Sequence, residues 1–387
     1  MSHPEGPQGR LDIAVFFDAP EENWPSMDLS GAMLFEQWRS CPSLGVAPAR
    51  VSIRIPSLVR RVAGPRSAAF NADRALTRYV AYPLRALATR RPGRLFHVVD
   101  HSYAQLVHAL PGARTGVYCH DLDVFQPLLS PGKRPPSRAM RALARVLLEG
   151  MRSAAIVFHS TREVGGLLDT RGLVGRSRLV LAPFGVGPEF EPRHDQDDGA
   201  EGILSPLGGR SFMLHVGSGI PRKRLDVLFD VFARVRASHP ALCLVQQGAA
   251  LSAAQRAQID RLAISDALLQ PPKLDRSVLA GLYRRAAVVL VTSEAEGFGF
   301  PVLEALACGA VVVASDLPTL REVGGNAVLY APMGDVSAWT AMVSAALDQP
   351  NSAPSRETRL ARARTFTWEQ HAQRLRDAYA DLAKRSA

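Results

Sequence analysis

Short apolar runs alternate with longer amphipathic segments along most of the chain. Short runs bounded by turn residues are typical of buried strands, and apolar positions three and four apart are typical of helices. The alternation predicts βα units built around parallel sheets. The predicted strands are Asp12–Phe17, Arg50–Arg54, Leu95–Val99, Thr115–Cys119, Ala155–Phe158, Leu179–Ala182, Phe212–Val216, Leu242–Gln246, Val288–Thr292, Val311–Ala314 and Val328–Tyr330.

The amphipathic segments between these strands predict helices. They are Asp73–Arg90, Arg138–Met151, Thr161–Thr170, Lys223–Ala237, Ser277–Ala286, Pro301–Ala307, Ser337–Leu347 and Trp368–Leu382.

One stretch interrupts the alternation. Residues 191–209 are polar, rich in Pro, Gly and Asp, and lack periodicity, as a linker does. A chain of 387 residues also exceeds what a single core usually holds. We therefore expect an α/β protein of two doubly wound, Rossmann-like domains (1–190 and 210–367) facing a cleft. The last helix, within 368–387, is expected to pack back across their junction.

Composition narrows the class of protein. The chain is 47% hydrophobic and 21% charged, as in ordinary globular domains. No apolar run approaches the length that spans a bilayer, and the polar N-terminus predicts no signal peptide. Three of the four cysteines (Cys119, Cys243 and Cys308) lie in or beside apolar stretches and predict buried thiols of a reducing compartment. We expect a cytoplasmic protein without a structural metal.

The net charge of +10 is unevenly distributed. Residues 50–94 contain eleven arginines and one acid, Asp73, and a second basic stretch runs over residues 133–152. On the predicted helix Arg138–Met151, Arg138, Arg141 and Arg145 share one face, and we expect the apolar residues on the other. Two interpretations remain open. The first domain binds an anionic membrane surface at the inner face of the cell membrane, or its arginines are simply solvated.

The segment 293–309, SEAEGFGFPVLEALACG, carries the strongest chemical signal. Pro301 stands where a helix should begin and Gly309 where it should end. The N-terminus of such a helix offers free N–H groups and a partial positive charge, and nearby glycines let an anion approach. Glu296 precedes this loop, and Glu304 is expected in the first helical turn. The pattern predicts a site for a phosphate or a sugar.

This stretch resembles the E-x7-E motif of retaining glycosyltransferase family 4, the glycosyl transferases of group 1. Here it reads Glu296-Gly-Phe-Gly-Phe-Pro-Val-Leu-Glu304. Residues 282–286 (LYRRA), 311–315 (VVVAS) and 322–327 (EVGGNA) are similar to the family's flanking segments. The resemblance implies the GT-B fold and a retaining hexosyltransferase that needs no cofactor. Its donor would be a nucleotide-diphosphate sugar.

Donor contacts follow from the same resemblance. Glu304 is implied to bind the nucleotide ribose and Glu296 the sugar hydroxyls. The basic pair in Gly217-Ser-Gly-Ile-Pro-Arg222-Lys223 would stabilise a diphosphate leaving group. Gly217-x-Gly219 alone is a weak dinucleotide signal, because Arg222 occupies the third glycine position. The full set of predicted donor-binding residues is Gly217, Arg222, Lys223, Glu296, Gly297, Phe298, Gly299, Phe300 and Glu304.

In the first half, the histidine of Val117-Tyr-Cys-His120-Asp-Leu resembles the family histidine that points at the donor sugar. His120 and Glu296 are therefore the predicted catalytic residues. Asp121-Leu-Asp123 spells a metal-binding D-x-D, which we interpret as coincidental because the family's chemistry needs no metal. Two features depart from the family. Phe184 replaces an asparagine, and the glycine-rich loop after the first strand is missing, with only Gly31 remaining.

The implied function is transfer of mannose or another hexose to a saccharide or lipid-linked acceptor, in polysaccharide or glycolipid synthesis. A phosphorylase or nucleotide-sugar epimerase of the same fold stays open, as does a non-catalytic protein that binds nucleotide sugar or an anionic surface. Nucleic acid is not an expected partner, because aromatic residues are only 7% and no recognition motif is present.

Overall fold

A computed structural model describes residues 10–57, 68–129, 136–192, 199–248 and 250–385. The chain forms two compact units. Unit 1 comprises Met1–Gly185 and Trp368–Ala387, and unit 2 comprises Val186–Thr367. The chain therefore passes between the units twice. The first passage lies a few residues before the boundary expected at 190, and the second at the start of the last predicted helix.

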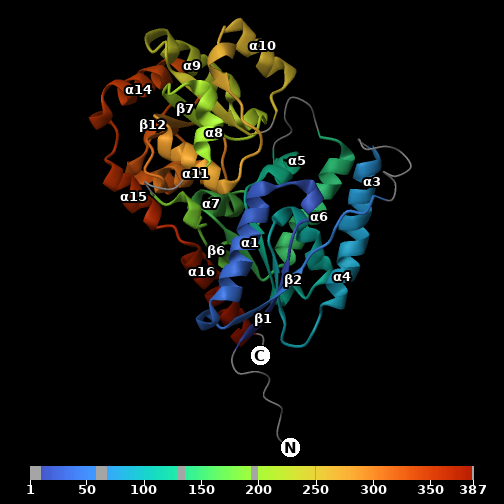
Figure 1. The fold of residues 1–387 in the computed structure, drawn as a ribbon. Helices are drawn as coiled ribbons and strands as arrows, with labels where there is room; N and C mark the ends of the chain where they lie inside the picture. Colours follow the sequence, from blue (N-terminus) through green and yellow to red (C-terminus); the bar gives the residue numbers. More distant parts are fainter. Residues whose placement is uncertain (1–9, 58–67, 130–135, 193–198, 249, 386–387) are drawn as a thin grey trace, which may run out of the picture. The chain divides into compact units, whose positions relative to one another are not determined.

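Unit 1 is built on a six-stranded parallel sheet in the order β2-β1-β3-β4-β5-β6 (Figure 1). The strands are β1 (Leu11–Phe16), β2 (Val46–Val51), β3 (Leu95–Val98), β4 (Thr115–Cys119), β5 (Ile156–His159) and β6 (Leu179–Leu181). Five predicted strands are confirmed to within one residue at each end. The prediction Arg50–Arg54 was wrong in its bounds, because the strand that pairs with β1 at the sheet edge runs from Val46 to Val51.

The faces of this sheet are covered by different helices. Ala14, Phe16 and Phe96 point into a core shared with α4 and α6, whereas His97 points to the opposite face. The helices of unit 1 are α1 (Pro25–Ser40), α3 (Ala68–Leu76), α4 (Tyr82–Ala88), α5 (Gln126–Leu129), α6 (Arg138–Ser153), α7 (Arg162–Thr170) and α16 (Trp368–Arg385). A π-helical turn, η3 (Thr77–Ala81), joins α3 to α4, and a 3-10 segment, η4 (His101–Ala109), follows β3.

The final helix, α16, is an integral part of unit 1. The Trp38 indole of α1 donates to the Ala372 carbonyl at 3.1 Å, and the Tyr379 hydroxyl lies 2.8 Å from His97 Nδ1. A Cβ atom at position 116 would lie 2.3 Å from the Tyr379 hydroxyl, so Gly116 permits this close approach. The end of the chain therefore completes a domain begun by its first strand.

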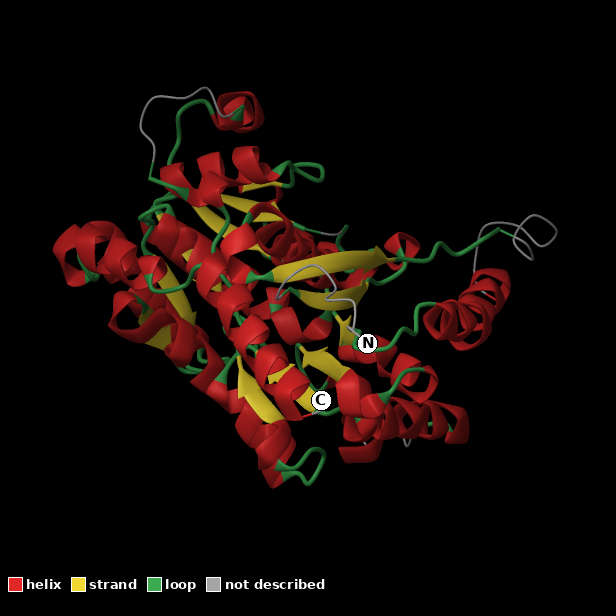
Figure 2. Ribbon diagram, turned by 90° about the horizontal axis from the view of Figure 1, so that it is seen from below, coloured by secondary structure: helices red, strands yellow, loops and turns green. Residues whose placement is uncertain are grey.

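Unit 2 repeats the architecture with a sheet in the order β12-β11-β10-β7-β8-β9. Its strands are β7 (Phe212–Val216), β8 (Cys243–Gln247), β9 (Leu268–Leu269), β10 (Val288–Val291), β11 (Val312–Ser315) and β12 (Leu329–Ala331). Its helices are α8 (Ala200–Leu204), α9 (Leu225–Ser238), α10 (Ala253–Arg261), α11 (Arg276–Arg285), α12 (Phe300–Ala307), α13 (Pro318–Gly324), α14 (Val336–Asp348) and α15 (Arg356–Arg364). Figure 2 shows the strands of the chain from another direction, with helices around them. The α/β prediction with two doubly wound domains is confirmed.

Several local predictions need correction. The helix expected at Asp73–Arg90 begins at Ala68 and is interrupted by the π turn. The stretch 17–31, which stands where the family has a glycine-rich loop, enters helix α1 at Pro25, so Gly31 is a helical residue. A Cβ atom there would lie 3.1 Å from both Phe17 and Val99, so this glycine serves helix–sheet packing. β9 and helices α5, α8, α10, α13 and α15 had not been predicted, and α8 lies within the stretch expected to be a linker.

Candidate functional site

In unit 2 the loop between β10 and α12 lies at the carboxyl edge of the sheet. Helix α12 begins at Phe300, and Gly299 precedes it with a φ of 99°. A side chain at Gly299 would be strained there and would lie 2.6 Å from Leu320. The glycine therefore lets the loop turn directly into the helix, whose first N–H groups form an anion-binding terminus.

Two cations from another loop are bound to Glu296. A short 3-10 turn, η10 (Pro221–Lys223), follows β7. Lys223 Nζ lies 2.5 Å from Glu296 Oε1, and Arg222 Nη1 lies 3.4 Å from Oε2. Ser293 also donates to Oε1 at 2.7 Å. Burial raises the pKa of Glu296, but the charges of Lys223 and Arg222 outweigh it and the net pKa is lowered. Glu296 is therefore a carboxylate that fixes two cations beside α12.

Glu304 occupies a different environment from the one we predicted. It is the fifth residue of α12 rather than a member of its first turn, and its side chain is 7% exposed. Arg276 Nη1 lies 3.5 Å from its Oε1, and the Tyr283 hydroxyl donates to Oε2 at 3.3 Å. Burial raises the pKa of Glu304 to about 7, and Arg276 and Tyr283 offset only part of this effect. Because both contacts are long, the carboxylate keeps capacity to accept hydrogen bonds from hydroxyl groups.

The glycines of the β7 loop are required by close packing. A Cβ atom at Gly217 would lie 2.9 Å from the imidazole of His215, which is buried in β7. One at Gly248, after β8, would lie 1.9 Å from the Gly217 carbonyl oxygen. Burial lowers the pKa of His215 to about 3, so this histidine is neutral beside Lys223. The loop is thus held tightly against the strand ends.

The remaining predicted donor residues lie in the same loop. Phe298 is buried and packs edge-on against Phe300 and Phe366, with ring centroids 5.2 and 5.8 Å apart. The ring of Phe298 anchors the loop to the body of unit 2. The structure therefore brings all nine predicted donor residues to the carboxyl edge of one sheet, supplied by the β7 and β10 loops and by α12.

His120 lies in unit 1, at the end of β4. Its Nε2 is 2.8 Å from the Val99 carbonyl, and Phe184 stacks on its ring with centroids 5.5 Å apart and planes 18° apart. Burial lowers the pKa of His120, and the charge of Asp100 offsets part of this effect. Phe184, the departure from the family's asparagine, therefore fixes the imidazole ring.

Unit 1 also holds a cluster of ionisable groups that the sequence analysis missed. Asp18 follows β1, and Asp100 and His101 follow β3; all three are almost fully buried. His101 Nδ1 lies 3.0 Å from Asp100 Oδ1, and Asp121, which is 20% exposed, lies 3.7 Å from Nε2. Both carboxyl oxygens of Asp18 lack a hydrogen-bond donor among the described residues. The signal was present, because each of these residues directly follows an apolar strand, as His120 does.

The protonation states within this cluster differ. Burial and the neighbouring Asp100 raise the pKa of Asp18, which favours its protonated form. Burial also acts on Asp100, but the hydrogen bond from His101 outweighs it and lowers the pKa of Asp100. The same bond raises the pKa of His101 against the effect of burial. The cluster therefore places two carboxyl groups with opposite pKa shifts together, and such groups can both donate to and accept from hydroxyl groups.

The D-x-D sequence makes a local turn. Asp121 Oδ1 accepts from the backbone N–H of Asp123 at 3.0 Å. Within the described parts of the chain, no group of three or more His, Cys, Asp or Glu side chains is placed to hold a metal ion.

Over the same residues, no helix combines the length and apolarity that crossing a bilayer requires. Cys119, Cys243 and Cys308 are buried free thiols, as predicted.

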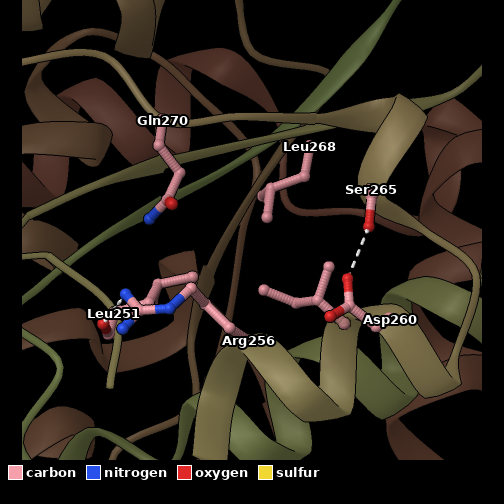
Figure 3. A pocket seen from close by; sticks show the side chains of 7 residues that line it. Leu251, Arg256, Asp260, Ser265, Leu268 and Gln270 are labelled. Atoms are coloured by element: carbon pink, nitrogen blue, oxygen red, sulfur yellow. Dashed lines mark hydrogen bonds between the residues drawn. The ribbon is translucent and has the colours of Figure 1, made fainter. Parts of the chain in front are cut away.

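A hollow of about 280 Å³ lies elsewhere in unit 2, beside α10 (Figure 3). Leu251, Arg256, Asp260 and Gln270 are among the residues that line it, and none is a predicted donor residue. Gln270 Nε2 donates to Gln246 Oε1 at 2.7 Å, and Gln246 donates to the Gly217 carbonyl at 3.0 Å. Two amides thus connect the hollow to the β7 loop.

Comparison with known proteins agrees with this geometry. Residues 203–364 match the family model described as glycosyl transferases group 1. The chain is similar to a D-inositol 3-phosphate glycosyltransferase of Geodermatophilus obscurus, with 31% identity over 67% of this chain and 59% of the relative. It is also similar to the O-antigen chain mannosyltransferase B of Escherichia coli, with 26% identity over 65% of this chain and 66% of that protein. Both matches thus span less than two thirds of these relatives.

Two solved structures share the whole fold at low sequence identity. Anabaena HepE, in complex with UDP and glucose, covers 96% of this chain with a TM-score of 0.73 and 15% identity, and all of HepE is matched. Sucrose-phosphate synthase of Thermosynechococcus elongatus covers 98% with a TM-score of 0.71 and 17% identity, and it too is matched over its full length. The chain therefore belongs to the glycosyl transferases of group 1, and its two units have the GT-B fold.

Proposed function

We propose that the protein transfers a hexose from a nucleotide-diphosphate sugar to a hydroxyl group of a saccharide or lipid-linked acceptor, with retention of configuration. The observation that carries the proposal is the arrangement at the edge of the unit 2 sheet. Two cations, Arg222 and Lys223, form ion pairs with Glu296 beside the N-terminus of α12. Positive charge fixed in advance stabilises the diphosphate as negative charge develops on it.

In this proposal Glu304 binds the ribose of the nucleotide. Its buried carboxyl has long contacts to Arg276 and Tyr283 and can accept from two vicinal hydroxyl groups. Burial that raises the pKa of a carboxyl costs folding free energy, and such costs are typical of functional sites. Glu296 orients the cations and contacts the sugar hydroxyls, while the backbone of residues 297–300 faces the sugar and the β-phosphate.

The departing diphosphate supplies the basic oxygen that takes the proton of the acceptor hydroxyl. The bond from the anomeric carbon to the phosphate oxygen breaks, and the new bond to the acceptor oxygen forms on the same face. Arg222 and Lys223 hold the charge that leaves with the phosphate. We assign the acceptor to the Asp18–Asp100–His101 cluster of unit 1, where Asp121 opens toward solvent.

We infer a place in the synthesis of cell-surface polysaccharide or glycolipid. The support is the name of the Escherichia coli relative, an O-antigen chain mannosyltransferase, and the basic charge of unit 1. The donor sugar and base are to be found by screening UDP- and GDP-linked hexoses for release of free nucleoside diphosphate, with and without membrane extract as acceptor.

The proposal predicts that nucleoside diphosphate is released from one of these donors and that membrane extract increases the release. Release that requires only inorganic phosphate would instead indicate a phosphorylase. Conversion of the sugar without an acceptor would indicate an epimerase, and binding without turnover a non-catalytic protein. Each of these outcomes would contradict the proposed transfer.

A further inference from the structure

Two rows of large apolar side chains are exposed on unit 1. The first follows α3, the π turn and α4, where Leu84 is 61% exposed. The second follows α6, where Met140 is 54% exposed. Apolar side chains of this size are usually buried, and an exposed group of them marks an interaction surface. The exposed residues are Leu76, Tyr79, Val80, Leu84, Leu87, Met140, Leu143 and Val146, which we call the apolar rows.

The spacing shows that each row is one face of a helix. Leu76, Val80, Leu84 and Leu87 are three or four residues apart, and Met140, Leu143 and Val146 are three apart. Ala144, Leu147, Leu148 and Met151 of the same helix are buried. Met140 and Leu143 stand four residues before Ala144 and Leu147, so the exposed row borders the buried face and continues it toward the start of the helix. The apolar surface of α6 is therefore wider than the part of it that is buried.

The two rows lie on elements that pack on the same segment. α4 and α6 both pack on the segment η4. The exposed imidazole of His108 in η4 lies 3.1 Å from the Val146 carbonyl of α6. Arg90, which follows α4, donates to the Ala109 carbonyl at the end of η4, at 2.9 Å. The end of η4 thus connects the middle of α6 to the end of α4.

Arginines border both rows, and acids are nearly absent from them. Arg85, Arg91, Arg138 and Arg145 are exposed. On the same helices Asp73 is buried, and Glu149 is paired with Arg152 at 3.0 Å. Of the other arginines in the basic stretch, Arg60, Arg61 and Arg66 lie outside the described residues, as does Lys133. The described part of the surface therefore combines exposed apolar side chains with a positive border.

We propose that this surface docks on an anionic lipid bilayer, with the apolar rows inserted at the level of the headgroups and the arginines on lipid phosphates. Apolar residues together with arginine on one face are the composition that interfacial helices use. A second copy of the chain fits this face less well. A two-fold interface places the same patch on both partners, so it would bring arginine against arginine with few acids between them.

The π turn links this surface to the polar cluster of unit 1. Tyr79 and Val80 lie in the turn and belong to the apolar row, whereas Arg78 of the same turn points inward. Arg78 lies 3.2 Å from Glu22 and stacks over Tyr103 at 4.0 Å. Docking would therefore bring the Asp18–Asp100 cluster close to the headgroups. This consequence rests on the proposed function, in which a lipid-linked acceptor would reach the cluster directly from the membrane.

Co-sedimentation of the full chain with vesicles tests the proposal. Vesicles of phosphatidylcholine with a third phosphatidylglycerol should bind the protein at low salt, and binding should fall steeply as salt screens the charges. The double variant Leu84→Ser/Met140→Ser should bind at least about tenfold more weakly, because the inserted apolar area is lost. Met333→Ser is the matched control, since Met333 is 55% exposed in unit 2.

The proposal is overturned by equal binding to pure phosphatidylcholine, by absence of binding to anionic vesicles at low salt, or by equal binding of the double variant. A dimer in solution that the double variant dissociates would show that a second copy occupies the surface instead. Release of nucleoside diphosphate from a water-soluble donor should be unchanged in both variants. That measurement separates a failure of docking from a failure of the proposed transferase activity.

Discussion

The carboxyl edges of the two sheets both end six-stranded parallel sheets, but they carry different ionisable groups. In unit 2 the edge carries Arg222, Lys223 and Arg276 around two glutamates. In unit 1 the corresponding edge carries Asp18 and Asp100, with His101 as a partner. Parallel sheets place ligands at this edge in both cases, but the fold alone does not determine which ligand.

The difference assigns a substrate to each unit. A cationic edge with a helix N-terminus stabilises a diphosphate, whereas a carboxyl pair binds neutral hydroxyl groups and disfavours phosphate. We therefore expect donor chemistry to depend on unit 2 and acceptor preference to depend on unit 1.

Glu296→Gln should have the largest effect. The amide keeps the shape but loses the charge that holds Lys223 and Arg222, so kcat/KM for the donor should fall about 100-fold. The free energy of unfolding should change by only about 1–2 kcal/mol, because both cations reach solvent. Glu294→Gln, at a side chain 47% exposed, is the matched control and should leave kcat/KM unchanged. Full activity in Glu296→Gln would remove this residue from the site.

Glu304 should make donor binding depend on pH. Only the carboxylate accepts from both ribose hydroxyls, so with a pKa of about 7 in the free protein, affinity for the nucleotide sugar should rise about tenfold from pH 6 to pH 8. Calorimetry with the intact donor measures this. In Glu304→Gln the dependence should disappear, and a variant that keeps it would contradict the assignment.

The same group should affect stability with a defined sign. The pKa of Glu304 is raised from 4.5 to about 7 in the folded protein, so stability is lost as pH rises through that window. Melting curves of Glu304→Gln should therefore shift upward relative to the wild type between pH 5 and 8.

Asp18→Asn should act on the acceptor and leave the donor alone. Losing the proton-bearing carboxyl should raise KM for the acceptor about fivefold, while acceptor-free hydrolysis of the donor stays constant. If hydrolysis and transfer fall together, unit 1 does not have the separate role that the charge comparison gives it.

A chelator should have no effect. Arg222, Lys223 and the α12 N-terminus provide the charge that a metal would otherwise supply, so donor cleavage should be unchanged in excess EDTA. Loss of activity that magnesium or manganese restores would contradict this expectation and would make Asp121 and Asp123 candidate metal ligands.

The sequence predicted the loop between β10 and α12 in unit 2 better than the edge strand of unit 1, for a physical reason. Strand β10 is a continuous apolar run, β7 is interrupted only by His215, and the loop before α12 is bracketed by Gly299 and Pro301. The residues of these elements therefore indicate by themselves where the strands end and where the helix begins. β2 carries alanine, proline and arginine at a sheet edge and has no such signature. Helix α1 was missed because its N-terminal Pro25 follows other breakers that suggested a loop.

The features that the sequence analysis missed depend on tertiary packing, which no local sequence pattern describes. The position of Glu304 in the motif was readable, but its burial against Arg276 and Tyr283 depends on α11. The exposure of Met140, Leu143 and Val146 on α6 could not be predicted, because periodicity does not show which apolar residues of a helix are covered by other elements. Asp100 and Asp18 interact only because β1 and β3 are neighbours in the sheet.

Titration of nucleoside diphosphates into the full chain tests the central claim most directly. Calorimetry with UDP and GDP should show binding of at least one of them to the wild type and to Arg224→Ala, whose side chain is paired with Asp226 at 2.8 Å. The variant Arg222→Ala/Lys223→Ala should lose at least about 100-fold in affinity, since two charge-assisted contacts to the diphosphate are removed. Equal affinity in the wild type and the double variant, or no binding of either nucleotide, would contradict a donor site at this edge of unit 2.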